Sequence, residues 1–174
     1  MKQIFLDISA AIESVNQINW VDFDLGQLEQ SMPPVSFPCA LMSFNTAGFT
    51  DLANNAQQGD LSITIRIAFR TYERTHNKVS APKRLAGLAH LDVIDAVHRK
   101  VNGLSGDDYT SLSRSSYKTE NRADLRIYQM NYTTLFKDDA TDDAGQDNGN
   151  TKVYRKFKEV TNAEPEFCTQ VTTK

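Results

Sequence analysis

The sequence predicts an α+β protein in which an antiparallel or mixed β-sheet with a long hairpin is packed by an N-terminal helix and one long central helix. Two patterns predict the sheet. Apolar and polar residues alternate over 61–72, and two strand-like runs over 110–136 are joined by a short turn. Apolar residues at helical spacing over 3–16 and 82–102 predict the two helices.

Bulk composition is that of a globular protein with no general attraction to nucleic acid or lipid. The 174 residues fit one domain with or without a tail, and the formal net charge is −3. Cys39 and Cys168 form no CxxC pair, so nothing demands an oxidising compartment. No signal peptide and no stretch of roughly 18 apolar residues is present. We therefore expect a protein made in a cytoplasm, with no membrane partner.

The first part of the chain alternates regular elements with proline-rich and polar stretches. The helix over 3–16 packs by one apolar stripe, and the alternating run over 21–25 predicts a short strand that ends at Gly26. Prolines fix φ and donate no ladder hydrogen bond, so the stretch with Pro33, Pro34 and Pro38 reads as an extended connector. Cys39 to Phe44 is a predicted strand. Residues 45–58 are polar and predict a projecting loop.

The clearest pattern is the long strand over 61–72, whose odd positions from Leu61 to Phe69 are apolar. Pro82 suits the first turn of the following helix, and Gly103 suits its end. Apolar residues of this helix form a broad arc that we expect to lie on the sheet. They are Leu85, Leu88, Leu91, Ile94, Val97 and Val101.

The run over 110–136 predicts a hairpin with its turn at 121–124. In that register Tyr117 faces Tyr128, and Arg114 lies with Lys118 on an outward, mostly polar face. The composition then changes, because residues 137–152 contain five aspartates and two glycines. We expect an α+β domain over 1–137, followed by an acidic linker and an extended tail over 138–174.

No motif for catalysis, cofactor binding or metal binding is recognisable. His90 and His98 are eight positions apart, whereas a metal-binding pair on a helix is usually separated by three or four. The acidic stretch 139–150 resembles a calcium loop in composition but lacks the spacing and final glutamate of an EF-hand. Phosphate-loop, dinucleotide and nucleophile-elbow motifs are absent. We expect no enzyme, no cofactor and no metal site.

Basic residues recur at strand spacing and predict a surface for neighbouring subunits. Arg66 and Arg70 share one face of the long strand, and Arg114 and Lys118 repeat that spacing in the hairpin. One interpretation is a solubilising surface that blunts edge pairing. The others are salt bridges with an acidic neighbouring subunit or contact with phosphate.

Phe49, in the polar stretch 45–58, and His76, in the connection before the central helix, complete the candidate interface residues. His76 also fits a turn residue.

Five stretches of the chain resemble a known family. They are WVDFDLGQLE with PPVSFPCALMSF, then LSITIRIAFRTYERTHN, HLDVIDAVHRKVNGLSG and YQMNYTTLFKDDAT. Their order resembles the tail terminator, or tail completion, proteins of tailed bacteriophages over about residues 1 to 140. The resemblance implies a mixed or antiparallel sheet flanked by helices. It also implies a ring, typically of six copies, that caps the tail tube and meets the head connector. The family has no active site to carry over.

Three functions follow as hypotheses. The first is a tail terminator, a structural protein at the head–tail junction of a virion, whose partners are its own copies, the tail tube protein and a head-completion or connector protein. Sequence-specific nucleic acid is not among those partners. The alternative is another head–tail connector or adaptor ring that contacts the portal. The third is a small enzyme or ligand-binding domain, which would need a cluster of titratable residues.

Overall fold

A computed structural model describes residues 1–51, 57–70, 74–122 and 124–138. The chain divides into two compact units, one of residues 1–48 and 59–136 and one of residues 49–58 and 137–174. The first unit holds both helices and the hydrophobic core. The predicted linker and tail beyond Asp138 lie outside the described residues, so the expected boundary at 137/138 stays a prediction.

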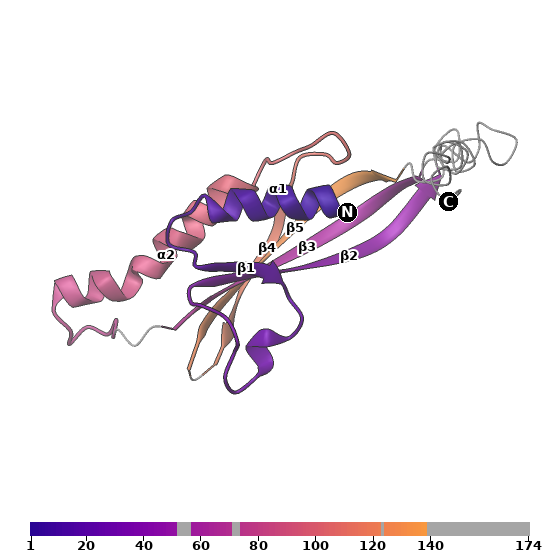
Figure 1. Cartoon of the computed structure of the whole chain (residues 1–174). Coiled ribbons are helices and arrows are strands. Elements are labelled where there is room, and N and C mark those ends of the chain that lie inside the picture. Colours follow the sequence, from indigo (N-terminus) through magenta and orange to yellow (C-terminus); the bar gives the residue numbers. More distant parts are fainter. Residues whose placement is uncertain (52–56, 71–73, 123, 139–174) are drawn as a thin grey trace, which may run out of the picture. The chain divides into compact units, whose positions relative to one another are not determined.

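The described elements follow the predicted order of helix, strand, strand, long strand, helix and hairpin (Figure 1). They are α1 (Lys2–Glu13), β1 (Trp20–Phe23), the 3-10 helix η1 (Gln27–Glu29), β2 (Cys39–Asp51), β3 (Gln57–Phe69), α2 (Ala81–Val101), β4 (Ser113–Asn121) and β5 (Arg126–Asp138).

The five strands form one mixed sheet in the order β1-β2-β3-β5-β4. Strand β1 pairs in parallel with β2, and β4 pairs antiparallel with β5. The α+β class, the mixed sheet, the hairpin and both packing helices are therefore confirmed.

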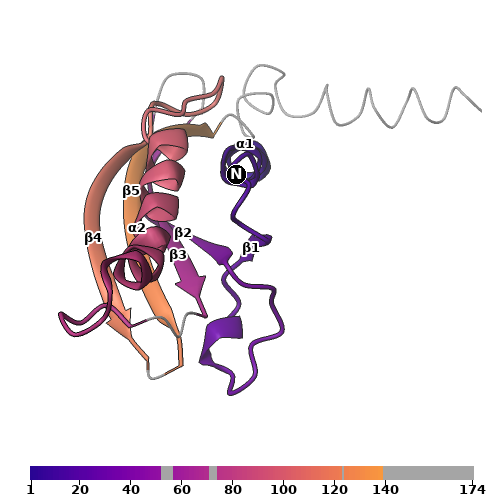
Figure 2. The ribbon, with the colours of Figure 1, turned by 90° about the vertical axis from the view of Figure 1, so that its left-hand side faces the viewer.

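One face of the sheet carries the main core, with α1 and α2 packed on it (Figure 2). Strand β3 supplies Ile63, Ile65 and Ile67, which are fully buried as their alternation predicted. They meet the stripe of α1 that includes Ile8 and the last turns of α2 that include Val97. Burying a large aliphatic side chain contributes about 1.5–3 kcal/mol, so these isoleucines stabilise the packing of both helices on the sheet.

The opposite face is covered by the connector between β1 and β2. Leu28 of η1 packs in a second, smaller cluster with Cys39, Ala68 and Ile127. The turn of the hairpin is attached to this connector, because the Arg122 guanidinium donates a hydrogen bond to the Leu28 carbonyl. Cys39 is a free thiol with no access to solvent, and burial raises its pKa to about 11. Cys39 is therefore a small buried residue of this cluster.

Two histidine–tyrosine pairs connect α2 to β5. His90 Nε2 lies 2.7 Å from the Tyr128 hydroxyl, and His98 Nδ1 lies 3.0 Å from the Tyr132 hydroxyl. Eight residues of helix rise about 12 Å and four residues of strand about 13 Å, so the two spacings match. The Gly87 carbonyl, 2.9 Å from His90 Nδ1, can only accept, so that nitrogen carries the proton and Nε2 accepts from Tyr128.

The polar stretch 45–58 differs from its prediction as a loop. Strand β2 extends to Asp51 and β3 begins at Gln57, so both strands run into it. Gln57 Nε2 donates to Asp51 Oδ1 over 2.8 Å at these strand ends. Small and polar residues have weak strand propensity, but cross-strand pairing overrides it.

The hairpin register also differs from its prediction. Tyr117 pairs with Met130 instead of Tyr128, and a bulge between Arg114 and Ser116 shifts the pairing again. Tyr128 becomes the diagonal neighbour of Tyr117, and their rings still stack with centroids 6.0 Å apart. Sequence pattern alone does not reveal a bulge, because the extra residue follows from local geometry.

The first half of α2 does not lie on the sheet as expected. Leu85 is 70% exposed, and Leu88 and Leu91 are also exposed. Val93, Ile94, Val97 and Val101 are buried. The predicted apolar arc was therefore right only for the second half of the helix.

Acidification should destabilise the fold through His90 and His98. Burial, with Arg126 near His90 and Arg114 near His98, lowers the pKa of both, and Asp95 partly opposes this at His98. The unfolded chain therefore binds protons at a higher pH than the folded one. The two neutral histidines therefore contribute to the free energy of unfolding. Their contribution is complete above the ordinary histidine pKa of 6.5 and is lost as the pH falls through their lowered folded-state pKa values.

Urea unfolding at about pH 7.5 and about pH 5.5 measures the effect, because most carboxylates keep their charge across that range. The double variant His90→Gln/His98→Gln should lose less free energy of unfolding between the two pH values than the unmodified chain. Equal losses would contradict this assignment.

Candidate interaction surface

Arg66 of β3 is the centre of a three-carboxylate network. Its Nη1 donates to Asp24 Oδ2 over 3.0 Å. Its Nη2 donates to Glu29 Oε1 over 2.9 Å and to Glu120 Oε2 over 2.7 Å. Only 13% of the Arg66 side chain is exposed. The network therefore ties the connector after β1 and the end of β4 to the middle strand.

Two opposing effects set the charge state of Arg66. Burial disfavours the guanidinium, but hydrogen bonds to Glu120, Asp24 and Glu29 outweigh it and raise the pKa above its ordinary value. A permanently charged group with three carboxylate partners is a structural ion-pair network. In this conformation Arg66 has little capacity left for a carboxylate of a neighbouring subunit.

Arg70 lies at the end of β3, and it is exposed. Its guanidinium carbon lies 4.9 Å from the centre of the Phe37 ring, in cation–π geometry. A groove of about 610 Å³ opens beside it, between α2, the end of β3 and the segments that precede β1 and β2. Its lining includes Asn19, Pro38, Phe69, His90 and Asp92. Arg70 is the candidate residue with an accessible charge next to a hollow.

The other two residues of the predicted basic stripe lie on opposite faces of the sheet. Arg114 pairs with Tyr132, whose hydroxyl contacts His98 of α2, so Arg114 lies on the helix side. Lys118 pairs with Gln129 on the Arg66 side. The single stripe is therefore wrong, because the bulge after Arg114 changes the face. A role for either residue in an interface stays a prediction.

His76 and Phe49 are both exposed. His76 Nδ1 accepts from the Lys78 amide over 3.2 Å, and its carbonyl accepts from Arg84 Nη2 over 3.4 Å. These bonds make His76 a turn residue at the start of α2. Phe49 lies in β2, in the second unit. The four basic candidates do not form one site, and an interface role for His76 and Phe49 stays a prediction.

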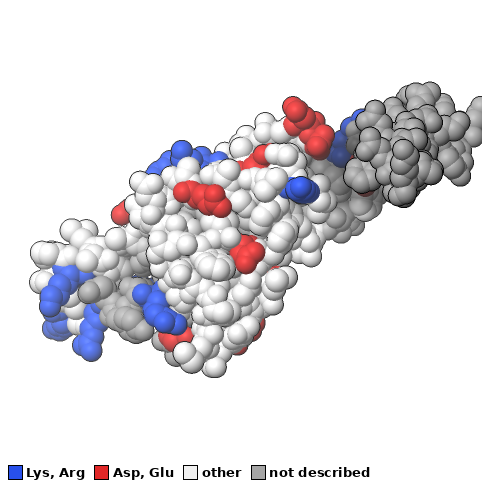
Figure 3. All heavy atoms as spheres, viewed as in Figure 1, with Lys and Arg blue, Asp and Glu red and all other residues white. Residues whose placement is uncertain are grey.

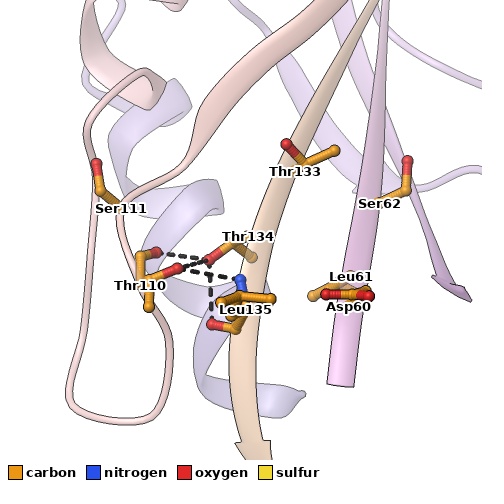
Figure 4. Close-up of a pocket in the computed structure, with 8 residues that line it drawn as sticks. All are labelled: Asp60, Leu61, Ser62, Thr110, Ser111, Thr133, Thr134 and Leu135. Carbon is orange, nitrogen blue, oxygen red and sulfur yellow. Dashed lines mark hydrogen bonds between the residues drawn. The ribbon is translucent and has the colours of Figure 1, made fainter. Parts of the chain in front are cut away.

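A second hollow, of about 390 Å³, is lined by hydroxyl groups between β3, β5 and the segment before β4 (Figure 4). Two of its threonines, Thr110 and Thr134, are hydrogen bonded to each other. Thr134 Oγ1 donates to the Thr110 carbonyl over 2.6 Å, and the Leu135 amide donates to Thr110 Oγ1 over 3.0 Å. These bonds attach residue 110 to the edge of β5, which is a structural use of the hydroxyls.

The start of α2 carries a concentration of positive charge that the sequence analysis missed. We call Arg74, Lys78, Lys83 and Arg84 the basic end of α2. Residues 74–91 contain no Asp or Glu, and Figure 3 shows Lys and Arg gathered near the start of this helix. The absence of acidic residues from 74–91 was visible in the sequence and could have identified this surface.

The exposed leucines of α2 adjoin these charges. Leu85 follows Arg84, and Leu88 lies one helical turn further on. Helical spacing places both far from the direction of buried Ile94 and Val97. Exposed apolar residues rimmed by charge are typical of a surface that binds another protein. The basic end and these leucines form the candidate interaction surface.

Two absences apply to the part of the chain that the structure describes. No group of three or more His, Cys, Asp or Glu residues is placed there to hold a metal ion. Neither helix combines the length and apolar character needed to cross a bilayer.

Replacing Arg66 should destabilise the protein much more than replacing its exposed partner. Arg66→Met leaves Asp24, Glu29 and Glu120 without their cation, which should cost about 2–4 kcal/mol of unfolding free energy. Glu29 is 68% exposed, so Glu29→Gln should cost about 1 kcal/mol or less. Chemical denaturation of both variants measures the difference, and similar losses would contradict the central role of Arg66.

Comparison with known proteins identifies no family. No protein-family model matches the chain, and no curated protein matches it. Among solved structures, a chain described as "Virion of native gene transfer agent (GTA) particle" matches with a TM-score of 0.47 and 10% sequence identity. The match covers 78% of this chain and 92% of that chain. A likeness at this level does not establish a function.

Proposed function

We propose that this chain is a structural virion protein. In this proposal it is a tail terminator that forms a ring, typically of six copies, at the head-proximal end of a phage tail. The ring caps the tail tube and joins it to the head connector. Its partners are its own copies, the tail tube protein and the head-completion or connector protein. It uses no cofactor and catalyses no reaction.

The observation that carries the proposal is the surface at the start of α2, where exposed leucines lie beside four cations in a run, 74–91, that contains no Asp or Glu. Exposed Leu85 and Leu88 give no stability to a subunit that works alone, because apolar side chains stabilise a protein only when they are removed from water. The resemblance of residues 1 to about 140 to tail terminators supplies the kind of assembly. An α+β fold with a mixed sheet and two helices agrees with that resemblance.

Purified full-length protein should assemble on its own or with the tail tube protein of the same virus. Light scattering should give a mass of several copies, and electron microscopy should show rings, six-fold in the proposed case. Added to polymerising tube protein, it should shorten the tubes by capping them. Twelve-fold rings that bind a portal would favour the adaptor alternative. A strict monomer that neither caps nor co-sediments with tubes would overturn the proposal.

The leucines of α2 should matter to assembly and not to folding. Leu85→Lys adds a charge to the 70% exposed position and should weaken assembly at least about tenfold, with an unchanged unfolding midpoint. Leu25 is 81% exposed and lies outside this surface, so Leu25→Lys is the matched control. Equal assembly of the two variants would count against a role of this surface in the ring.

A further inference from the structure

Charges of opposite sign lie at the two ends of α2. The basic end lies before the helix and in its first turns, and exposed Asp107 and Asp108 follow the helix in the segment 103–112. We call the segment 103–112, with its two aspartates, the acidic loop. The 21 residues of α2 span about 30 Å, so the two groups of one copy are too far apart to pair with each other.

The basic end costs α2 stability. The positive pole of the helix dipole lies at its start, where anions are favourable and cations unfavourable. Lys83 and Arg84 occupy the first turns, and no acidic residue lies in the first turn to offset them. Helix formation therefore does not explain these cations, whereas an external anionic partner would relieve their repulsion.

The acidic loop is held in a fixed conformation. The Gly103 amide donates to the Leu112 carbonyl, and the Leu112 amide donates to the Leu104 carbonyl, each over 2.8 Å. Gly106 lies so close to the Tyr109 ring that a side chain there would collide with it. The Tyr109 hydroxyl donates to Asp7 Oδ2 over 3.0 Å and anchors the loop to α1. Little conformational entropy is lost when such a preformed loop binds.

We propose that the basic end of α2 in one copy binds the acidic loop of the next copy. The partner is a second copy because each chain carries both complementary charges and cannot join them internally. A contact between two different surfaces of identical subunits repeats around a closed ring. Carboxylates placed at the start of α2 would also interact favourably with the helix dipole. This inference rests on the proposed function and names the contact that builds its ring.

Reciprocal charge reversal tests the contact. Lys78→Glu/Lys83→Glu should lower the self-association constant on the order of 100-fold, as should Asp107→Lys/Asp108→Lys, because like charges then meet. An equimolar mixture of the two variants should recover assembly, since each variant supplies what the other lacks. Light scattering over a concentration series measures all three samples. Lys2→Glu is the control, because Lys2 is likewise an exposed lysine in the first turn of a helix.

The outcomes separate this inference from the proposed function. Wild-type rings with unaffected reversal variants, or a mixture that fails to assemble, would overturn this contact and leave the ring proposal standing. A wild-type chain that never assembles would overturn both. If Lys78→Glu/Lys83→Glu abolishes retention on DNA without changing assembly, the basic end binds phosphate and the contact between copies is wrong.

Discussion

The charge of Arg66 constrains much of the second face of the sheet. A guanidinium with little solvent access needs anionic partners, and Asp24, Glu29 and Glu120 come from segments far apart in the sequence. Once they converge, the connector after β1 and the end of β4 are fixed above β3. Leu28 can then pack on Cys39 and Ile127. Arg66, which the sequence predicted as a contact for a neighbouring subunit, therefore holds distant segments of its own chain together.

The sequence predicted those parts of the fold that depend on local periodicity. The alternation from Leu61 to Phe69 and the stripe of α1 both place their apolar residues in the core. Pattern failed where long-range geometry decides, as in the bulge after Arg114 and the strand ends near Asp51 and Gln57. Neither is encoded in a local hydrophobic period.

The same limit explains why the sequence pattern did not reveal the candidate interaction surface. Spacing identified Arg66 and Arg70 as neighbours on one strand, but it could not reveal which cations meet an anion of the same chain. Exposed Leu85 was read as core because an apolar helical residue looks the same whether a sheet or another protein covers it. The absence of acidic residues from 74–91 was the one local signal, and it depends on composition alone.

The histidine–tyrosine pairs divide α2 into parts with different freedom to evolve. Between His90 and His98 the length of the helix is matched to β5, so an inserted or deleted residue would turn one pair out of register by about 100°. Before Gly87 no such match exists, and side chains there can change without disturbing the sheet. The first turns of α2 can therefore acquire a new binding specificity by substitution, while the rest of the helix preserves the scaffold.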